Sequence, residues 1–184
     1  MSDKNLPVPQ LLDGARRRET EAIAVLYQMY ADRLYAYFYY RVADEHTAED
    51  LTENVFGKMI EALPTCRAQT LETFTAWLFQ IARRFLINYY RQTQRQPVET
   101  LTENIAAADN VEDDIDQGVS LHRLQQALTT LTDEQREVVI LKFINGCSNA
   151  EIAQVMGKTE DCIKALQYRA LSALRRALNS HLDH

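Results

Sequence analysis

The chain has 184 residues, of which 46% are hydrophobic and 25% are charged, and its formal net charge is −6. This length fits one domain or two small ones, and no run of residues is long and apolar enough to cross a membrane. The first residues lack the charged start and apolar core of a secretory signal peptide, so we expect a cytoplasmic protein.

Apolar residues recur at spacings of three and four, and the chain has only 5 glycines and 4 prolines. This pattern predicts an all-α fold. Cys66, Cys147 and Cys162 are far apart, form no CxxC pair and have no histidines near them at zinc-ligand spacing. We therefore expect three reduced, mostly structural thiols, and neither a metal site nor a cofactor.

The N-terminal half is predicted to form four helices, near residues 8–17, 20–42, 44–63 and 71–94. The second helix has a wide apolar face, made by Ile23, Leu26, Tyr27, Tyr30, Leu34, Tyr37 and Phe38. Thr47 is the expected cap of the third helix, with Asp50 three residues further on. Pro64 stops that helix, and a loop leads to the fourth.

The fourth helix has two distinct faces. Its apolar stripe consists of Phe74, Trp77, Leu78, Ile81 and Phe85, and a polar, basic line consists of Gln80, Arg84, Asn88, Arg91 and Arg95. The ordinary interpretation of such a line is a solvated face, but no acidic residue occurs from Thr73 to Val98. Aromatic side chains beside cations are also typical of proteins that bind single-stranded DNA.

Residues 98–120 contain seven acidic side chains, no basic one and no aromatic one. Since like charges repel and extend a chain, this segment is predicted to be a flexible linker. It accounts for more than the whole net charge, and the flanking residues 1–97 and 121–184 are close to neutral. The sequence thus predicts two small helical domains joined by an acidic linker.

The C-terminal part carries the spacing of a helix-turn-helix. A helix over residues 121–131 and one over 132–145 lead to Ile152, Ala153, Gly157, Ile163 and Leu166, where the alanine allows close helix crossing and the glycine makes the turn. No acidic residue occurs from Lys164 to Asn179, whereas four cations do. A one-sidedly basic helix suits a phosphate backbone, although a plain helical hairpin in a bundle would share the apolar pattern.

Three segments together resemble the extracytoplasmic-function (ECF) sigma factors, a two-domain class of bacterial RNA polymerase initiation factors. The stretch from Ala48 to Phe56 (AEDLTENVF) resembles the polymerase-binding motif of region 2. The stretch from Trp77 to Arg91 resembles the helix that melts the promoter and reads the minus-ten element. Residues 131–171 resemble region 4, which reads the minus-thirty-five element. The resemblance implies sigma region 2 for residues 1–97 and sigma region 4 for 121–184.

The resemblance also implies roles for individual residues. The polymerase-binding positions are Glu49, Asp50, Leu51 and Phe56, where two acids and an exposed aliphatic group suit a basic coiled-coil partner. The loop over residues 65–70 matches the family's pocket for a flipped promoter base, to which Arg67 and Gln69 offer polar edges. With these two, the line Gln80, Arg84, Asn88, Arg91 and Arg95 forms the expected minus-ten surface.

On the recognition helix we expect the exposed DNA-binding residues Thr159, Glu160, Lys164, Gln167 and Arg169. Thr159 is a candidate cap that presents backbone amides to a phosphate, and Lys164 and Arg169 are candidates for phosphates or guanine edges. Glu160 has two interpretations that the sequence leaves open: it accepts a hydrogen bond from a cytosine, or it complements the helix dipole.

The expected partners are core RNA polymerase, promoter DNA and an anti-sigma factor, with no membrane insertion and no enzymatic activity. The linker is either an RNA-like polyanion that occupies a basic channel or a solubilising tether. The main alternative function is a stand-alone helix-turn-helix regulator, which would bind duplex DNA well on its own and core polymerase poorly.

Overall fold

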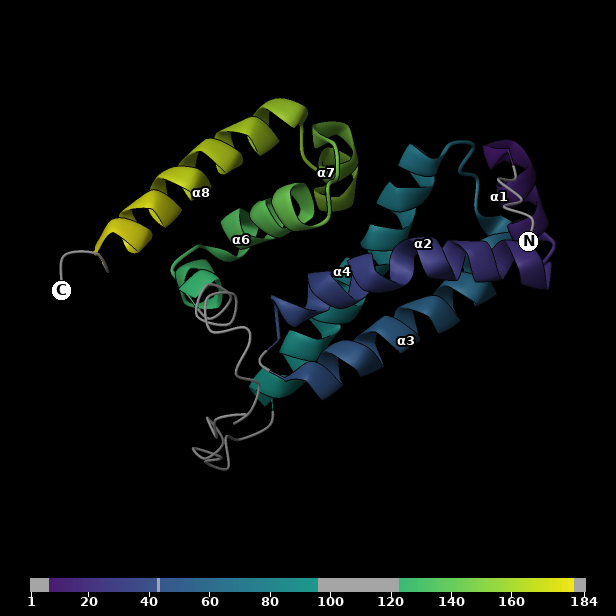
Figure 1. Ribbon diagram of the computed structural model, residues 1–184, viewed down its shortest axis with the longest axis horizontal. Helices are drawn as coiled ribbons and strands as arrows, with labels where there is room; N and C mark the ends of the chain where they lie inside the picture. The colour runs from purple at the N-terminus through teal and green to yellow at the C-terminus, as the bar shows by residue number, and fades with distance from the viewer. Residues whose placement is uncertain (1–6, 43, 96–122, 181–184) are drawn as a thin grey trace, which may run out of the picture.

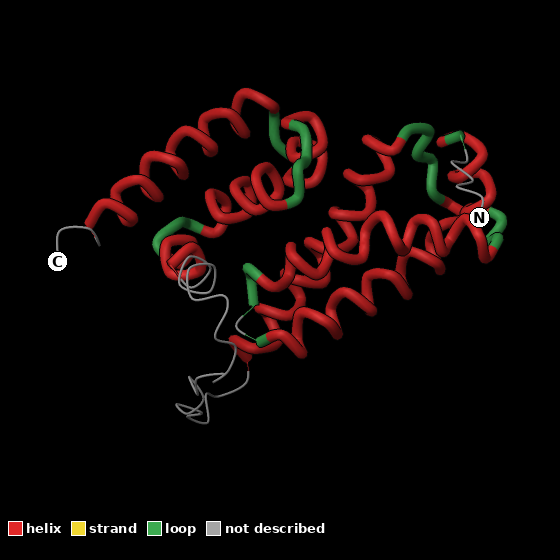
Figure 2. Tube along the Cα trace, in the orientation of Figure 1, coloured by secondary structure: helices red, strands yellow, loops and turns green. Residues whose placement is uncertain are grey.

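The computed structural model describes residues 7–42, 44–95 and 123–180, and within these ranges it contains helices and loops but no strand (Figures 1 and 2). The acidic segment 98–120 lies outside the described residues. A helix over residues 123–129 begins the C-terminal part. The other elements are α1 (Val8–Arg16), α2 (Thr20–Tyr39), α3 (Glu45–Ala62), η1 (Leu63–Thr65), α4 (Leu71–Arg95), α6 (Asp133–Val139), η2 (Ile140–Ile144), α7 (Asn149–Met156) and α8 (Glu160–Ser180). None of the described helices is long and apolar enough to span a membrane.

The N-terminal domain is a bundle in which α2 and α3 lie side by side and α4 crosses them (Figure 1). Its core contains five aromatic rings that are at most 1% exposed: Tyr30, Tyr37, Phe38, Phe74 and Phe79. Aromatic rings bury the largest apolar areas of all side chains, so these rings dominate the burial in this domain. The predicted apolar face of α2 is largely confirmed, except that Tyr27 is 53% exposed; its ring packs against that of Phe56 of α3 at a tilt of 43°.

Two predicted details of the N-terminal domain are wrong. Helix α2 ends at Tyr39, not near Val42. The cap of α3 is Asp44, whose carboxylate accepts hydrogen bonds from the backbone N–H and the hydroxyl of Thr47, at 2.9 and 2.8 Å. Thr47 occupies the third helical position, because a residue in extended conformation is needed at the cap and Asp44 supplies it (φ −135°, ψ 128°).

The C-terminal domain begins its helices with reciprocal caps. Thr132 and Ser148 each accept a hydrogen bond from the backbone of the third helical residue, Gln135 and Glu151, whose side chains bond back to the cap N–H. These are capping boxes, which satisfy two free N–H groups at a helix start. Between them, the predicted single helix over 132–145 changes to π geometry at Ile140–Ile144.

Glycines in the left-handed conformation end the two helices that precede the recognition helix. Gly146 has φ +66° and Gly157 has φ +64°, a conformation that costs other residues roughly 1–2 kcal/mol. Gly157 therefore forms the turn of the helix-turn-helix as predicted. Ile152 of α7 and Ile163 and Ala170 of α8 are fully buried, and α8 packs on both α7 and α6.

The C-terminal domain packs on the N-terminal one. Helix α7 lies against α4, and η2 lies against α2 (Figure 1). Helix α8 extends away from the bundle on the other side of α7. This domain contact joins segments that are distant in the sequence, and no local pattern indicates it.

Candidate functional site

The recognition helix α8 presents a polar face that its packing defines. Ile163, Leu166 and Ala170 are buried against the rest of the domain, so the opposite side is exposed. Thr159 accepts a hydrogen bond from the backbone N–H of Cys162 at 3.2 Å, which confirms it as the cap of α8. Lys164 is 61% exposed and lies 3.6 Å from Asp161, a surface ion pair that a DNA phosphate can displace. Glu160 and Arg169 are exposed as expected.

Gln167 and Tyr168 differ from expectation. Gln167 is half-buried, and its amide donates a hydrogen bond to Asn149 Oδ1 of α7 at 2.8 Å. It therefore joins the two helices of the motif and is not a freely exposed contact. Tyr168, which sequence reasoning missed, is 76% exposed on the same helix between Lys164 and Arg169. Its spacing of four from Lys164 is the signal that places the two on one face.

The basic line of α4 is divided by the domain contact. Arg84, Asn88 and Arg91 are exposed. Gln80, in contrast, donates a hydrogen bond of 2.8 Å to the backbone carbonyl of Gln154 in α7. The side chain of Arg95 lies outside the described part of the structure. The line is therefore open from Arg84 to Arg91, and its first member, Gln80, is engaged.

A cavity of about 280 Å³ lies between α3 and α4, beside this open part of the line. Three apolar side chains of α4 form part of its wall, together with two cations and an amide. Its lining residues are Lys58, Ala62, Trp77, Ile81, Arg84, Phe85 and Asn88. An apolar recess with cations at its edge has the chemistry that an unstacked base and its phosphate require.

The loop over residues 65–70 is fixed by an arginine from α1. The Arg16 side chain donates hydrogen bonds to the backbone carbonyl of Cys66, at 2.9 Å, and to that of Ala68. Cys66 and Ala68 point into the core, whereas Arg67 and Gln69 are exposed. The loop thus presents both predicted side chains on a backbone that Arg16 holds in place.

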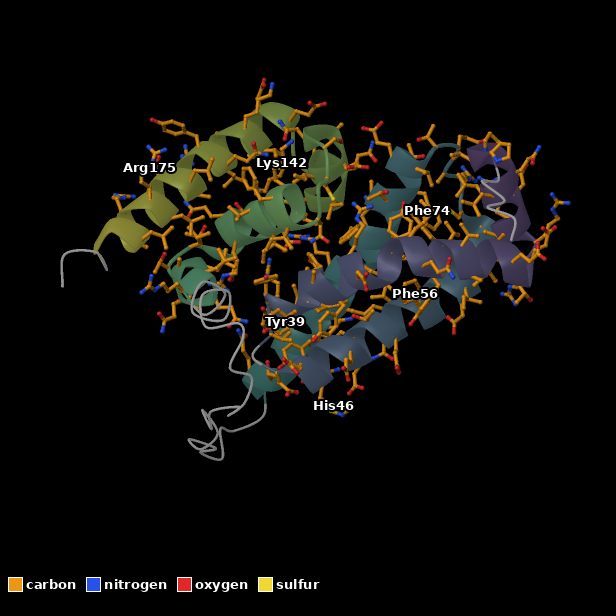
Figure 3. All side chains as sticks on the ribbon, viewed as in Figure 1. Tyr39, His46, Phe56, Phe74, Lys142 and Arg175 are labelled. Atoms are coloured by element: carbon orange, nitrogen blue, oxygen red, sulfur yellow. The ribbon has the colours of Figure 1, made fainter. Side chains whose placement is uncertain are left out.

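Helix α3 carries an exposed acidic patch. Glu49 and Asp50 are 64% and 58% exposed, and the ring nitrogens of His46 lie 4.0 and 3.7 Å from their carboxylates. Figure 3 shows His46 on the outer side of α3. Leu51 and Phe56 are only 7% and 6% exposed, so the expected exposed aliphatic group is wrong. Both side chains pack in the core because α3 is amphipathic: its apolar residues lie on the inner face and its acidic residues on the outer face.

A buried ionic cluster joins the two domains. Glu137 of α6 accepts hydrogen bonds of 2.6 Å from the Tyr37 hydroxyl and from Arg41 Nη1. Arg83 Nε lies 4.0 Å from the same carboxylate. The side chains of Glu137 and Arg41 are each 5% exposed. The sequence analysis placed Tyr37 on an apolar face but indicated none of these polar contacts, because no local pattern marks a contact between residues so distant in the chain.

The charges of this cluster are consistent with its hydrogen bonds. Burial, reinforced by the neighbouring Glu137 carboxylate, raises the pKa of Tyr37 well above its usual value. Burial alone would lower the pKa of Arg41, but the attraction of Glu137 more than offsets this and raises it. Tyr37 therefore stays a neutral donor and Arg41 stays a cation at physiological pH.

Comparison with known families matches both domains. Residues 26–96 match the family model of sigma-70 region 2, and residues 121–174 match that of sigma-70 region 4. The region 2 match contains α3 with its acidic patch and the basic line of α4. The region 4 match contains the helix-turn-helix.

Two curated relatives belong to one class. The chain is 38% identical over 173 residues to the ECF RNA polymerase sigma factor BldN of Streptomyces coelicolor, covering 92% of this chain and 65% of BldN. It is 31% identical over 163 residues to the ECF RNA polymerase sigma factor SigX of Bacillus subtilis, covering 85% of this chain and 83% of SigX. The chain thus spans slightly less than two thirds of BldN and most of SigX.

A solved structure shares the fold. The sigma factor RpoE of Bartonella quintana, in complex with the anti-sigma factor NepR, superposes with a TM-score of 0.68 at 22% identity and covers 87% of this chain and 98% of that one. The matched helices include both domains. With both sigma regions present in order, and with a relative of 31% identity matched over most of its length, this chain belongs to the ECF class of RNA polymerase sigma factors.

Proposed function

We propose that the chain binds core RNA polymerase and directs initiation at promoters whose minus-ten and minus-thirty-five elements it reads. The observation that carries this proposal is the presence on one chain of an exposed acidic patch on α3, an exposed basic line on α4 and a helix-turn-helix. A stand-alone regulator needs only the last of these. In this proposal, residues 1–97 and 121–184 are the two working domains, and 98–120 connects them.

The polymerase contact is assigned to Glu49 and Asp50. Their carboxylates are exposed on one turn of α3, and charge complementarity with a basic partner helix would steer and register the complex. Leu51 and Phe56 act indirectly, since they anchor α3 in the core and so fix the direction of the two acids.

The minus-ten contact is assigned to Arg84, Asn88 and Arg91, with Gln80 available once α7 moves away. The cavity between α3 and α4 adds an apolar wall where an unpaired base of the separated strand can stack, with Lys58 near its phosphate. Arg67 and Gln69, on the loop that Arg16 fixes, are assigned to a flipped base further along the strand.

The minus-thirty-five contact is assigned to Thr159, Lys164 and Arg169, to which the exposed Tyr168 is added. The N-terminus of a capped helix offers N–H groups to a phosphate, and the two cations suit phosphates or guanine edges. Glu160 keeps two alternative roles: it contacts a cytosine, or it complements the helix dipole.

The proposal includes an anti-sigma factor as a regulatory partner and places the protein in the cytoplasm, where core polymerase is found. The solved sigma factor that shares this fold is bound to an anti-sigma factor. The chain acts by binding and positioning, and it is not an enzyme itself.

The deciding experiment is transcription from a promoter panel with purified bacterial core polymerase and the purified chain. Specific initiation that requires the chain supports the proposal. Tight binding to promoter duplex alone, with no binding to core polymerase, would favour the stand-alone regulator instead.

A further inference from the structure

One arginine of α1 holds the loop that leads from η1 into α4, and Figure 1 shows α1 beside this loop. Arg16 Nε donates a hydrogen bond to the backbone carbonyl of Cys66 at 2.9 Å, and Nη2 donates one to the backbone carbonyl of Ala68. These two nitrogens form one edge of the guanidinium group, whose N–H donors have a fixed planar geometry. A single rigid group therefore sets the separation of the two carbonyls.

The two carbonyls depend on Arg16 because the loop has little backbone bonding of its own. At the start of the loop, the backbone N–H of Cys66 bonds to η1 at 3.0 Å. At its end, the hydroxyl of Thr70 caps α4. Between these points, no backbone N–H in the described part of the chain bonds to the carbonyl of Cys66 or of Ala68. Without Arg16 both carbonyls would turn to water, and the loop would lose its fixed path.

The contact with Arg16 fixes the backbone on both sides of Arg67. The side chains of Cys66 and Ala68 are buried, at 6% and 9% exposure, whereas Arg67 and Gln69 are exposed. The peptide groups that precede Arg67 and follow Ala68 bond to the same guanidinium. The backbone between them cannot rotate without breaking a charge-assisted hydrogen bond. Arg16 thus sets the direction in which Arg67 points.

Arg16 is itself firmly placed. Its third nitrogen, Nη1, pairs with the carboxylate of Asp13, and its side chain is only 21% exposed. Helix α1 packs on α2 and on η1. The approach to α2 is so close at Gly14 that an added Cβ would lie 3.1 Å from Cβ of Ala22. The helix that carries Arg16 therefore has little room to shift relative to the bundle.

A fixed loop matters most for the choice between bases. Selectivity is a difference between two affinities, and a side chain on a mobile backbone can adapt to the edge of any base. A side chain on a fixed backbone favours the base whose donors and acceptors match its own. Arg67 offers only donors, and Gln69 offers a donor and an acceptor. Their selectivity thus depends on how the loop is held.

We propose that Arg16 is a positioning residue for promoter selectivity: by holding the carbonyls of Cys66 and Ala68 on one guanidinium group, it directs Arg67 and Gln69 at a single promoter base and sets which base the loop accepts. The inference rests on the proposed function, in which these two side chains read a flipped base. The hold on the loop can be measured without DNA or polymerase.

The first measurement uses Cys66 as a reporter of the loop. In the full chain with Cys147→Ala and Cys162→Ala, Cys66 is the only thiol, and it is buried. Its reaction with the disulfide reagent DTNB requires the loop to open. Arg16→Ala should speed this reaction by at least about tenfold, the change in opening expected from the loss of one charged hydrogen bond.

The second measurement is initiation with core polymerase, from a promoter in which each minus-ten position is changed in turn to all four bases. At the position that the loop reads, the wild type should prefer one base by roughly tenfold or more. Arg16→Ala should reduce this preference to about twofold or less. Preferences at the other positions should stay, because Arg84 and Asn88 lie on α4 and not on the loop.

Arg17→Ala is the matched control. It removes the same charge at the next position, where the side chain is 70% exposed and faces Glu19 at 3.6 Å, and it should leave both measurements unchanged. Arg16→Lys keeps the charge but replaces the planar fork with a single ammonium group, so it should give intermediate values in both. It also replaces Arg16→Ala if circular dichroism shows that the latter loses helix.

The inference is overturned if the Arg16 variants react at Cys66 as slowly as the wild type and keep its base preferences. An equal loss of initiation with all four bases would also overturn it, since that result marks a residue that only stabilises the fold. A wild type that initiates at no promoter contradicts the proposed function and the claim on selectivity together, whereas the thiol rates still decide whether Arg16 holds the loop.

Discussion

The two domains are stabilised in different ways. All five aromatic rings that are at most 1% exposed belong to the N-terminal domain. The buried residues described in the C-terminal domain include no aromatic ring; its apolar core consists of aliphatic side chains, alanines, a methionine and a cysteine. Its helices α6 and α7 are short, and short helices with aliphatic contacts gain less from burial, so they depend more on caps, glycine turns and packing on neighbouring helices.

The proposed DNA-binding faces of the two domains differ in how accessible they are. Helix α4 is enclosed by α3 on one side and α7 on another, and Gln80 at the start of its basic line is engaged by α7. Helix α8 packs on α6 and α7 and leaves Lys164, Tyr168 and Arg169 exposed. Figure 3 shows Arg175 on the outer side of the same helix. Access to the first face thus depends on the domain arrangement, whereas access to the second does not.

The largest expected effect concerns the proposed polymerase contact of the N-terminal domain. Asp50→Arg should lower the affinity for core polymerase by at least about 100-fold, because like charges placed together cost several kcal/mol at an interface. Surface plasmon resonance with immobilised core measures this. Asp50 is exposed, so circular dichroism should show an intact fold.

Glu21→Arg makes the same charge change at an exposed position in the first turn of α2 and should bind normally. Normal affinity of Asp50→Arg would remove the acidic patch of α3 from the interface.

The second effect concerns the C-terminal face alone. Lys164→Ala combined with Arg169→Ala should reduce transcription that depends on the minus-thirty-five element by roughly 10–100-fold. The slope of log K against log salt should fall by about two, one for each phosphate that the variant no longer neutralises. Binding to core polymerase should be unaffected.

As a comparison, Arg17→Ala with Arg123→Ala removes two exposed cations away from α8. If this pair changes the salt dependence as strongly as the pair on α8, the effect is one of total charge and not of the recognition helix.

The third effect sets one glycine of each domain against the other. Gly157→Ala should destabilise the C-terminal domain by roughly 1–2 kcal/mol, because φ of +64° is strained for alanine. Gly57→Ala, in the middle of α3, should stabilise the N-terminal domain by roughly 0.5–1 kcal/mol. A new Cβ meets no atom within 4 Å at either position, so the backbone alone decides the sign. Urea unfolding measures both, and equal signs would contradict this explanation.

The smallest effect is a pH dependence confined to the N-terminal domain. Hydrogen bonds from Thr47 lower the pKa of Asp44 below its usual value. The stabilisation by Asp44 is therefore complete above the ordinary Asp pKa of about 3.9 and is lost as the pH falls through the lowered value. Thr132 and Ser148, which cap α6 and α7, do not titrate in this range.

Thermal unfolding from pH 7 to pH 3 tests this. The advantage of the wild type over Asp44→Ala should shrink at the acid end, whereas Asp44→Asn, an equally good cap, should keep a constant advantage over Asp44→Ala. A constant difference for the wild type as well would show that the carboxylate charge is irrelevant.

Local signals in the sequence predicted several features correctly. The glycine turn at Gly157 and the cap at Thr159 follow from short-range backbone chemistry. Choices between neighbouring residues were less certain: Thr47 and Asp44 can both cap, and only the backbone conformation decided for Asp44. Leu51 and Gln167 were expected to be exposed, but each lies at the edge of a helix face where small rotations decide burial.

The sequence by itself determined the all-α fold, the helix-turn-helix, the two charged helical faces and the family, because each depends on spacing along one or two helices. The tertiary structure decided which residues of those faces are exposed and which are engaged by other helices. It brought Arg16 to the loop over residues 65–70, Gln80 to α7, and Tyr37 and Arg41 to Glu137. These contacts join residues separated by 50 to 100 positions, and they arise from how whole helices pack, which no local periodicity encodes.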